Sequence, residues 1–319
     1  MAEGNMKRMA VLAGCNYPNT PNELHGCIND VLTMQNTLIT RFGFDPTDIE
    51  LLTDAPDSTL LPTGENIKKA LGKMIDEAAS GDVLFFHYSG HGTRIPSVKS
   101  HRPFWKDEAI VPCDLNLITD MDFRELVNRL PEGASFTIIS DSCHSGGLID
   151  KEKEQIGPAT VPEKRALHIE QKPKTLPFET ILQQLSSVTN INTSDIGTHL
   201  LEFFGSNASL KFLSPQDEQE SVHPDAGILL SGCQANETSA DISSSGGGKK
   251  KAYGAFSNAV QMVLKENSGA LSNKEIVMLA RNVLLGQLVL GQHPCLYCSD
   301  ENASKPFLCQ PLESSSDII

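Results

Sequence analysis

The sequence has no long apolar segment and no excess of positive charge. No apolar run is long enough to span a bilayer, and the opening MAEGNMKRMAVLAG has no apolar core of signal-peptide length. These absences predict a cytoplasmic protein with no membrane partner. The net charge of −14 over 319 residues argues against nucleic-acid binding and favours cationic partners.

The sequence also lacks a disulfide framework and a strong zinc motif. Its eight cysteines are scattered, and most lie in or beside apolar runs, as reduced core cysteines do. One C-x-x-C pair, Cys295 and Cys298, follows His293, but no second pair accompanies it. Such a lone pair is more often part of a core than a zinc site, so we expect no metal there.

Strands and helices are predicted to alternate along most of the chain. Short apolar, β-branched segments predict strands at residues 8–15, 49–53, 83–86, 136–140, 227–231 and 293–298. Apolar residues at helical spacing predict helices at about residues 30–41, 63–78, 120–130, 252–265 and 272–284. This alternation implies parallel pairing. We therefore expect an α/β fold, a three-layer α/β/α sandwich around a mostly parallel sheet.

Composition suggests a division into two subdomains and a linker. We assign residues 1–150 to a large catalytic subdomain, 151–224 to a linker region and 225–319 to a small subdomain. The stretch 151–174 is rich in charge and proline and predicts an exposed linker. Residues 176–213 regain apolar side chains, so we expect helices there without placing them. Two more segments are predicted to be loops, residues 93–106 and 241–251.

The segment FTIISDSCHSGG, residues 136–147, places a cysteine directly after a predicted buried strand. In open α/β sheets, chemistry collects at the carboxyl ends of the strands. Cys143 lies at such an end, before two glycines. Taken alone, this segment is more typical of a buried structural cysteine.

A second segment of the same design, FFHYSGHG, favours catalysis. It is an apolar strand followed by His91 between two glycines. If the two strands are parallel neighbours, His91 and Cys143 emerge together, and a thiol beside an imidazole supplies a thiolate nucleophile. His87 alternates with core residues inside its strand, and His144 would point to the other side. We therefore assign His91 as the general base and acid, and find no third member of a triad.

A thiolate that attacks a carbonyl carbon produces an oxyanion, which requires hydrogen-bond donors. The main-chain N–H groups of Cys143 and Gly92 are the natural candidates, because glycine permits a close approach.

These motifs, HYSGHG followed by DSCHSGG, resemble those of the caspase and metacaspase cysteine peptidases. AVLAGCNYPNTPNELHGCINDV and EAIVPCDLNLITD are similar to segments of plant metacaspases. The absence of a prodomain before Lys7 resembles type II members, and the short linker resembles the short-linker members among them. The resemblance implies a caspase-like fold, peptide and protein substrates, and a role in plant programmed cell death or stress proteolysis. We expect a monomer.

Two acids predict the specificity of such an enzyme. Asp141 lies two residues before Cys143 on the same strand face, and Asp30 follows a loop expected at the same rim. Paired carboxylates would bind arginine or lysine. Asp30 is nearly as well explained as a helix cap. The metacaspase resemblance favours the pocket and adds Cys27 and Ser89 to its lining.

The resemblance also raises the question of calcium. Asp107, Glu108 and Asp150 match acidic positions linked to calcium in some metacaspases. The loop 97–105, SVKSHRPFW, is basic and apolar where calcium-dependent plant relatives are acidic. A hard cation needs several oxygen ligands, so we expect no metal or other cofactor to be required.

A pocket for basic residues predicts self-cleavage within the linker. Lys174 is the last basic residue before apolar residues resume, and Pro173 keeps its approach extended. We expect a zymogen that is cut between Lys174 and Thr175, with the uncut segment lying across the groove. Arg165 is the second candidate, because arginine pairs with two acids in a bidentate manner.

Two other functions remain open at this point. One is a legumain-like peptidase with asparagine specificity, against which the paired acids argue. The other is an inactive scaffold that binds peptides through the same groove, which the intact Cys143 and His91 disfavour.

Overall fold

The structure is a computed structural model that describes most of the chain. The described residues are 6–96, 106–143, 148–149, 153–156, 170–213, 227–234, 237–243, 252–287, 289 and 291–308. Among them, no helix combines the length and apolar character needed to cross a membrane.

A six-stranded sheet forms the centre of the molecule, in the spatial order β12-β9-β7-β3-β1-β2. Its strands are β1 (Arg8–Gly14), β2 (Ile49–Thr53), β3 (Val83–Ser89), β7 (Ser135–Asp141), β9 (Gly227–Ser231) and β12 (Cys295–Tyr297). The pairs formed by the first five strands are parallel, and only β12 is antiparallel to its neighbour. The expected mostly parallel α/β sheet is therefore confirmed.

Two small antiparallel sheets lie outside the central one. The first has the order β4-β5-β6 and contains β4 (Gly92–Pro96), β5 (Lys106–Ile110) and β6 (Ile118–Thr119). The second has the order β11-β10-β8 and contains β8 (Glu170–Pro173), β10 (Ala240–Ser243) and β11 (Ala252–Gly254).

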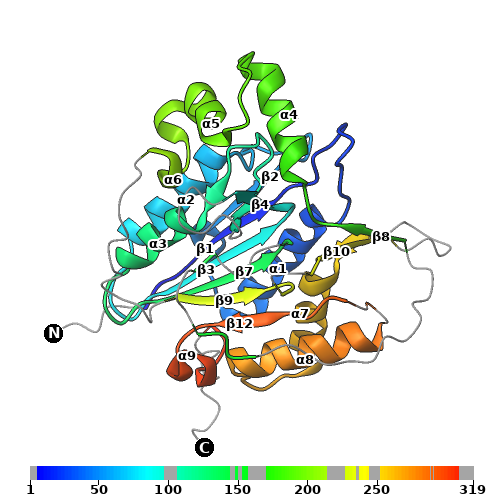
Figure 1. Cartoon of the computed structure of the whole chain (residues 1–319). Helices are drawn as coiled ribbons and strands as arrows, with labels where there is room; N and C mark the ends of the chain where they lie inside the picture. Colours follow the sequence, from blue (N-terminus) through cyan, green and yellow to red (C-terminus); the bar gives the residue numbers. More distant parts are fainter. Residues whose placement is uncertain are drawn as a thin grey trace, which may run out of the picture.

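Most of the described helices cover the two faces of the central sheet, and the others form a separate group above it (Figure 1). The helices that flank the sheet are α1 (Cys27–Phe42), α2 (Gly64–Asp76), α3 (Asp120–Asn128), α7 (Ala255–Glu266), α8 (Asn273–Gly286) and α9 (Asp300–Ser304). The separate group consists of α4 (Phe178–Thr189), α5 (Ile196–Phe204) and α6 (Leu210–Leu213). Short 3-10 turns are η1 (Pro46–Asp48) and η2 (Gly205–Asn207).

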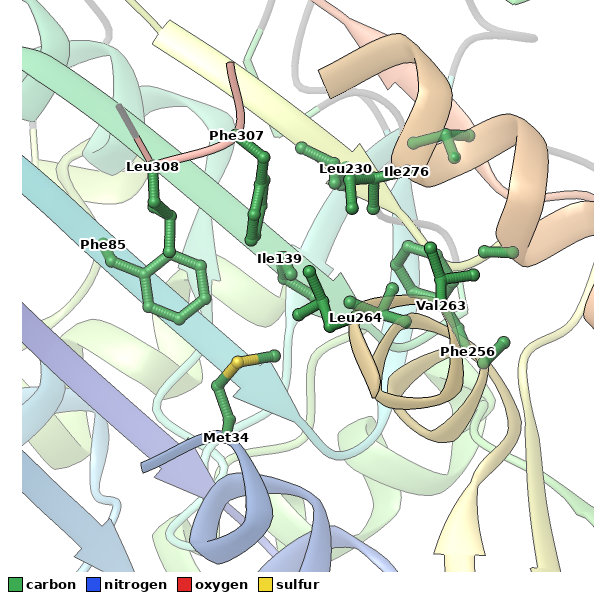
Figure 2. Close-up of a cluster of buried hydrophobic side chains, with 14 of the residues drawn as sticks. Met34, Phe85, Ile139, Leu230, Phe256, Val263, Leu264, Ile276, Phe307 and Leu308 are labelled. Atoms are coloured by element: carbon green, nitrogen blue, oxygen red, sulfur yellow. The ribbon is translucent and has the colours of Figure 1, made fainter. Parts of the chain in front are cut away.

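Apolar side chains on the two faces of the sheet form two cores, because side chains along a strand alternate in direction. In β3, Phe85 belongs to one core and Phe86 to the other. Figure 2 shows the first core, where Phe85 and Ile139 of the sheet face residues of α1, α7 and α8. This arrangement of helix, sheet and helix is the three-layer sandwich that the sequence predicts.

Capping side chains set the helix starts that the sequence predicts best. Thr63 accepts a hydrogen bond from the N–H of Asn66 at the start of α2. Ser272 and Glu275 form a reciprocal capping box at the start of α8, which satisfies donors that a helix start leaves unpaired. The predicted capping box of α8 is therefore confirmed.

The alternative interpretation of Asp30 as a helix cap is wrong. Helix α1 begins at Cys27, with Gly26 as its N-cap, so Asp30 lies inside the helix. Other groups bond to this helix start: Oδ1 of Asn16 accepts the N–H of Cys27, and the carboxylate of Asp241 accepts that of Gly26. The side chain of Asp30 is thus available for another role.

Three segments expected to be irregular contain strands. Residues 93–96 and 106 belong to the β4–β5 hairpin, and Asp241–Ser243 belong to β10. Residues 252–254, expected to be helical, form β11 ahead of α7. The end of the predicted linker forms β8, which pairs with β10 from Glu170↔Ser243 to Pro173↔Ala240. This pairing supplies a non-local partner that the linker composition did not reveal.

Candidate active site

The two motifs meet because β3 and β7 are parallel neighbours. Their register pairs Ser89 with Asp141 at the carboxyl ends of both strands. His91 follows the first of these residues by two positions and Cys143 follows the second by two. The structure therefore brings both motifs to one edge of the sheet, as the alternation of strands and helices predicts. Both His91 and Cys143 are buried.

The main chain of Lys174 lies against both motifs. Its carbonyl oxygen accepts hydrogen bonds from the N–H groups of Gly92, at 3.0 Å, and Cys143, at 3.2 Å. These are the two donors that the sequence predicts for an oxyanion. A Cβ atom at Gly92 would collide with the carbonyl oxygen of Cys143, so this close approach requires glycine.

The side chain of Lys174 enters a closed pocket between the two aspartates. Its Nζ lies 3.3 Å from Oδ2 of Asp141 and 3.4 Å from Oδ2 of Asp30. It donates hydrogen bonds to Oγ of Ser89 at 2.8 Å and to the carbonyl oxygen of Asp141 at 3.2 Å. The lysine side chain is 0% exposed, so the expectation that Lys174 is exposed in a linker is wrong.

The first turn of α7 holds both carboxylates. The N–H of Gly254 donates to both oxygens of Asp30, at 2.9 and 3.0 Å, and the N–H of Ser257 donates to Oδ2 of Asp141 at 2.8 Å. The positive end of the helix macrodipole adds to this stabilisation. A Cβ at Gly254 would collide with the ammonium of Lys174 and with both carboxylates, so the pocket also requires a glycine here.

The charges of the pocket shift one another's pKa values. Burial alone would lower the pKa of Lys174, but the Asp141 carboxylate raises it above its ordinary value. Burial opposes ionisation of Asp141, yet the ammonium and the N–H of Ser257 lower the pKa of Asp141 overall. Burial raises the pKa of Asp30 to about 7 against the opposing effect of the ammonium. Asp141 is therefore the firmly ionised partner.

The loop before α1 orients His91. Nε2 of its ring lies 2.7 Å from the carbonyl oxygen of Asn22. The ring packs on that of Tyr17, with 4.7 Å between centroids, and the N–H of His91 donates to the Tyr17 hydroxyl at 2.9 Å. Burial lowers the pKa of His91 to about 4, so the ring is neutral at neutral pH.

Ser239 connects the cysteine to the pocket. Its N–H donates to Sγ of Cys143 at 3.0 Å, and its hydroxyl donates to Oδ1 of Asp141 at 2.8 Å. Its carbonyl oxygen accepts the N–H of Lys174 at 2.8 Å. A single residue ahead of β10 thus contacts the candidate nucleophile, the acid of the pocket and the main chain in the groove.

Of the remaining candidate residues, two are buried near the pocket and three lie outside the described residues. Cys27 is buried beside the pocket, and burial raises its pKa well above the ordinary value, which disfavours a thiolate there. His87 is buried behind the pocket, with Nε2 3.0 Å from Oγ of Ser257. His144, Asp150 and Arg165 lie outside the described residues.

Two of the acidic residues considered for calcium, Asp107 and Glu108, have cationic partners. Nζ of Lys211 lies 2.8 Å from the carboxylate of Asp107 and 3.1 Å from that of Asp120. Arg94 lies 3.8 Å from Glu108. Among the described residues, no three His, Cys, Asp or Glu side chains are grouped to hold a metal ion. His293 instead pairs with Glu237, while Cys295 and Cys298 are buried.

Four contributors to the site were not identified from the sequence: Asn22, Ser239, Gly254 and Ser257. Asn22 acts through its main-chain carbonyl, which every residue possesses, so its identity carries no signal. Ser239 acts through its main chain and its hydroxyl, but only the fold brings it to Cys143 and Asp141 from far along the chain. The glycine and serine at the start of α7 could have been noticed as a strand-to-helix junction, but only the three-dimensional fold brings that junction beside Asp30 and Asp141.

Comparison with known proteins agrees with this geometry. The family model described as Caspase domain matches residues 7–304. The chain belongs to this family. It is 64% identical to Metacaspase-9 of Arabidopsis thaliana, over 96% of this chain and 98% of the relative. Metacaspase-6 of the same plant is 38% identical, over 95% of this chain and 100% of the relative.

A solved structure supports the fold alone. A crystal structure of a protein from Geobacter sulfurreducens matches with a TM-score of 0.62 and 19% identity, over 95% of this chain and 98% of that one. Family membership and the similarity to plant metacaspases identify this caspase-domain protein as a cysteine endopeptidase. Its substrates are therefore proteins and peptides.

Proposed function

We propose that this endopeptidase cleaves after lysine or arginine and that its first substrate is its own Lys174–Thr175 bond. The observation that carries the proposal is the position of Lys174. Its carbonyl oxygen lies at the two oxyanion donors while its ammonium lies between Asp30 and Asp141. Lys174 therefore supplies the carbonyl of the bond to be cut and also fills the specificity pocket, as one residue of a bound substrate would.

The chemistry follows from the same arrangement. Cys143 attacks the carbonyl carbon of Lys174 after its thiol proton passes to His91. The N–H groups of Gly92 and Cys143 stabilise the resulting oxyanion. His91 then protonates the departing nitrogen of Thr175, and water releases Lys174 from the thioester. The fragment that starts at Thr175 is the expected product.

The pocket suits both basic side chains. It offers two carboxylates, a hydroxyl and a main-chain carbonyl to a cation. A guanidinium has more donors than an ammonium and can bind two carboxylates at once, so arginine is an equal or better substrate. An aspartate or asparagine side chain would find no cationic group among these pocket residues, which disfavours both caspase-type and legumain-type specificity.

Two measurements test the proposal. A peptide library incubated with the purified protein should show cleavage after arginine and lysine and none after aspartate or asparagine. N-terminal sequencing of the small processed fragment should give Thr175 as the first residue. A fragment that starts at Ala166 would indicate Arg165 instead, and normal maturation of a Lys174→Ala protein would remove Lys174 as the essential cut.

The wider biology rests on the family. From the resemblance to plant metacaspases, we infer a role in programmed cell death or stress proteolysis. A plant lacking this protein should show altered cell death or stress tolerance, restored by the wild-type chain and not by a Cys143→Ala chain. Restoration by the Cys143→Ala chain would argue for the scaffold function instead.

A further inference from the structure

Leu176, the second residue after the Lys174–Thr175 bond, is held by a main-chain hydrogen bond and has a buried side chain. Its N–H donates a 3.0 Å hydrogen bond to the carbonyl oxygen of Gly92. Its side chain is 1% exposed and belongs to the buried apolar cluster that contains Ile95 of β4 and Val111, the residue after β5. The groove therefore holds the chain on both sides of the bond.

Gly92 is the residue that connects the two sides. Its N–H donates to the carbonyl oxygen of Lys174, and its carbonyl oxygen accepts the N–H of Leu176. Thr175 lies between these two contacts and forms a parallel bridge with Gly92. Main-chain bonds of this kind fix the register of a bound peptide, while side-chain pockets provide the selectivity. The buried position of Leu176 is such a pocket.

We propose that the region around Gly92, Ile95 and Val111 is a substrate subsite for an aliphatic side chain two residues after the cut. The inference rests on the proposed function, because it takes Lys174–Thr175 as the cleaved bond. In the uncut chain Leu176 fills the subsite, and in the processed enzyme an aliphatic residue of the substrate takes its place.

The chemistry of the lining selects the ligand. Ile95 and Val111 are both fully buried and belong with Leu176 to one buried apolar cluster. An aliphatic side chain gains free energy on leaving water for such a site. A carboxylate or an ammonium would lose its hydration without a partner. The subsite should therefore favour Leu, Ile and Val and exclude Asp and Lys.

A peptide series cleaved by the processed enzyme tests the subsite. Internally quenched peptides would copy residues 171–178, Gln-Lys-Pro-Lys-Thr-X-Pro-Phe, with X as Leu, Val, Ala, Asp or Lys. Because burial of a leucine side chain favours binding, kcat/KM for X as Leu should exceed that for Ala by about tenfold and that for Asp by more. Equal values across the series would overturn the subsite.

A companion peptide keeps the two proposals separate. It retains Leu at X and replaces the lysine before the cut by alanine. Strong cleavage of this peptide would overturn the basic specificity in the proposed function. If cleavage depends on that lysine but kcat/KM is the same for every residue at X, the basic specificity is supported and only the subsite is overturned.

The same test can be made within the chain. Leu176→Asp and Leu176→Ala should slow self-cleavage, by about tenfold for the alanine variant. Ile181→Ala is the matched control, since Ile181 is buried in the same cluster but lies on α4, beyond the bonds to Gly92. Thermal melting of each variant with Cys143→Ala added reports any loss of folding. Self-cleavage of Leu176→Asp at the rate of Ile181→Ala would contradict the proposal.

Discussion

The main-chain carbonyl of Asn22 accepts a 2.7 Å hydrogen bond from Nε2 of His91. A carbonyl oxygen only accepts, so Nε2 carries the proton and Nδ1 of the neutral ring is unprotonated. Nδ1 is buried and has no hydrogen-bond partner among the described residues. The uncut chain thus holds the nitrogen that would take the thiol proton in its basic form before any cut is made.

This arrangement predicts the effect of removing either catalytic group. On the proposed mechanism, Cys143→Ala should abolish self-cleavage and peptide cleavage, because it removes the proposed nucleophile, and His91→Ala should be severely impaired. Denaturing gels of the purified proteins should show only the full-length chain for Cys143→Ala. Cys113→Ser, which removes a thiol outside the site, is the control and should mature normally. Substantial processing of Cys143→Ala would redirect the search to Cys27.

Tyr17 should act as a positioning residue for His91. Its hydroxyl accepts the N–H of His91 and donates to the carbonyl oxygen of Val111. Tyr17→Phe keeps the ring that packs on the imidazole but leaves a buried N–H unpaired, at a cost of about 1–3 kcal/mol. We expect kcat to fall by roughly tenfold or more, with KM little changed.

The melting temperature, read together with kcat, separates this role from a purely structural one. Loss of folding would reduce the amount of active enzyme and the melting temperature, which is measured in the Cys143→Ala background. A Tyr17→Phe protein with wild-type kcat would show that the packing of the rings alone orients His91.

The two pocket acids should be separately essential for basic substrates. Removing either carboxylate leaves a buried cation with one partner, a loss of roughly 3–5 kcal/mol for a fully buried pair. Asp30→Asn and Asp141→Asn should therefore reduce kcat/KM for arginine and lysine peptides by at least about a hundredfold. The exposed Asp57→Asn serves as the charge-matched control. Unchanged specificity in Asp30→Asn would exclude Asp30 from the pocket.

The meeting of the His91 and Cys143 motifs at one edge of the sheet could be predicted because it depends on local patterns. A strand that ends shortly before His91 and another that ends shortly before Cys143 are each visible as an apolar run followed by polar residues and glycine. Parallel pairing then brings both to one edge. Those steps need only the alternation of strands and helices, which the sequence shows clearly.

The rest of the fold and of the candidate site depends on contacts between segments that are far apart in the sequence. Asp30 remained ambiguous because a helix cap and a pocket acid look alike until the start of α1 is known. Residues 241–243 looked like a loop, since β10 is short and pairs with β8 and β11 from far along the chain. Lys174 was expected to be exposed because composition does not report the groove that encloses it.

His87 should make stability depend on pH in the acidic range. Burial lowers its pKa to about 3, whereas an unfolded chain has a value near 6.5. Between these two pH values the unfolded chain binds a proton that the folded chain does not. The free energy of unfolding therefore decreases as pH falls from about 6.5 toward 3, by up to about 1.4 kcal/mol per unit for this residue.

Comparison of variants isolates this contribution. His91, whose pKa is lowered to about 4, acts in the same direction, and Asp30, whose pKa is raised to about 7, acts in the opposite one. Urea unfolding of Cys143→Ala and of Cys143→Ala with His87→Asn from pH 7 to 4 should show a shallower slope for the second. The exposed His25→Asn is the control. Equal slopes would mean that His87 is protonated in the folded chain.

The ion pairs around Asp107 and Glu108 predict activity without calcium. Lys211 pairs with Asp107 and Asp120, and Arg94 pairs with Glu108, so these carboxylates already have cationic partners. A calcium ion needs several free oxygen ligands. We therefore expect cleavage of arginine peptides to proceed equally with a chelator and with added calcium. Loss of activity in the chelator that calcium restores would contradict this.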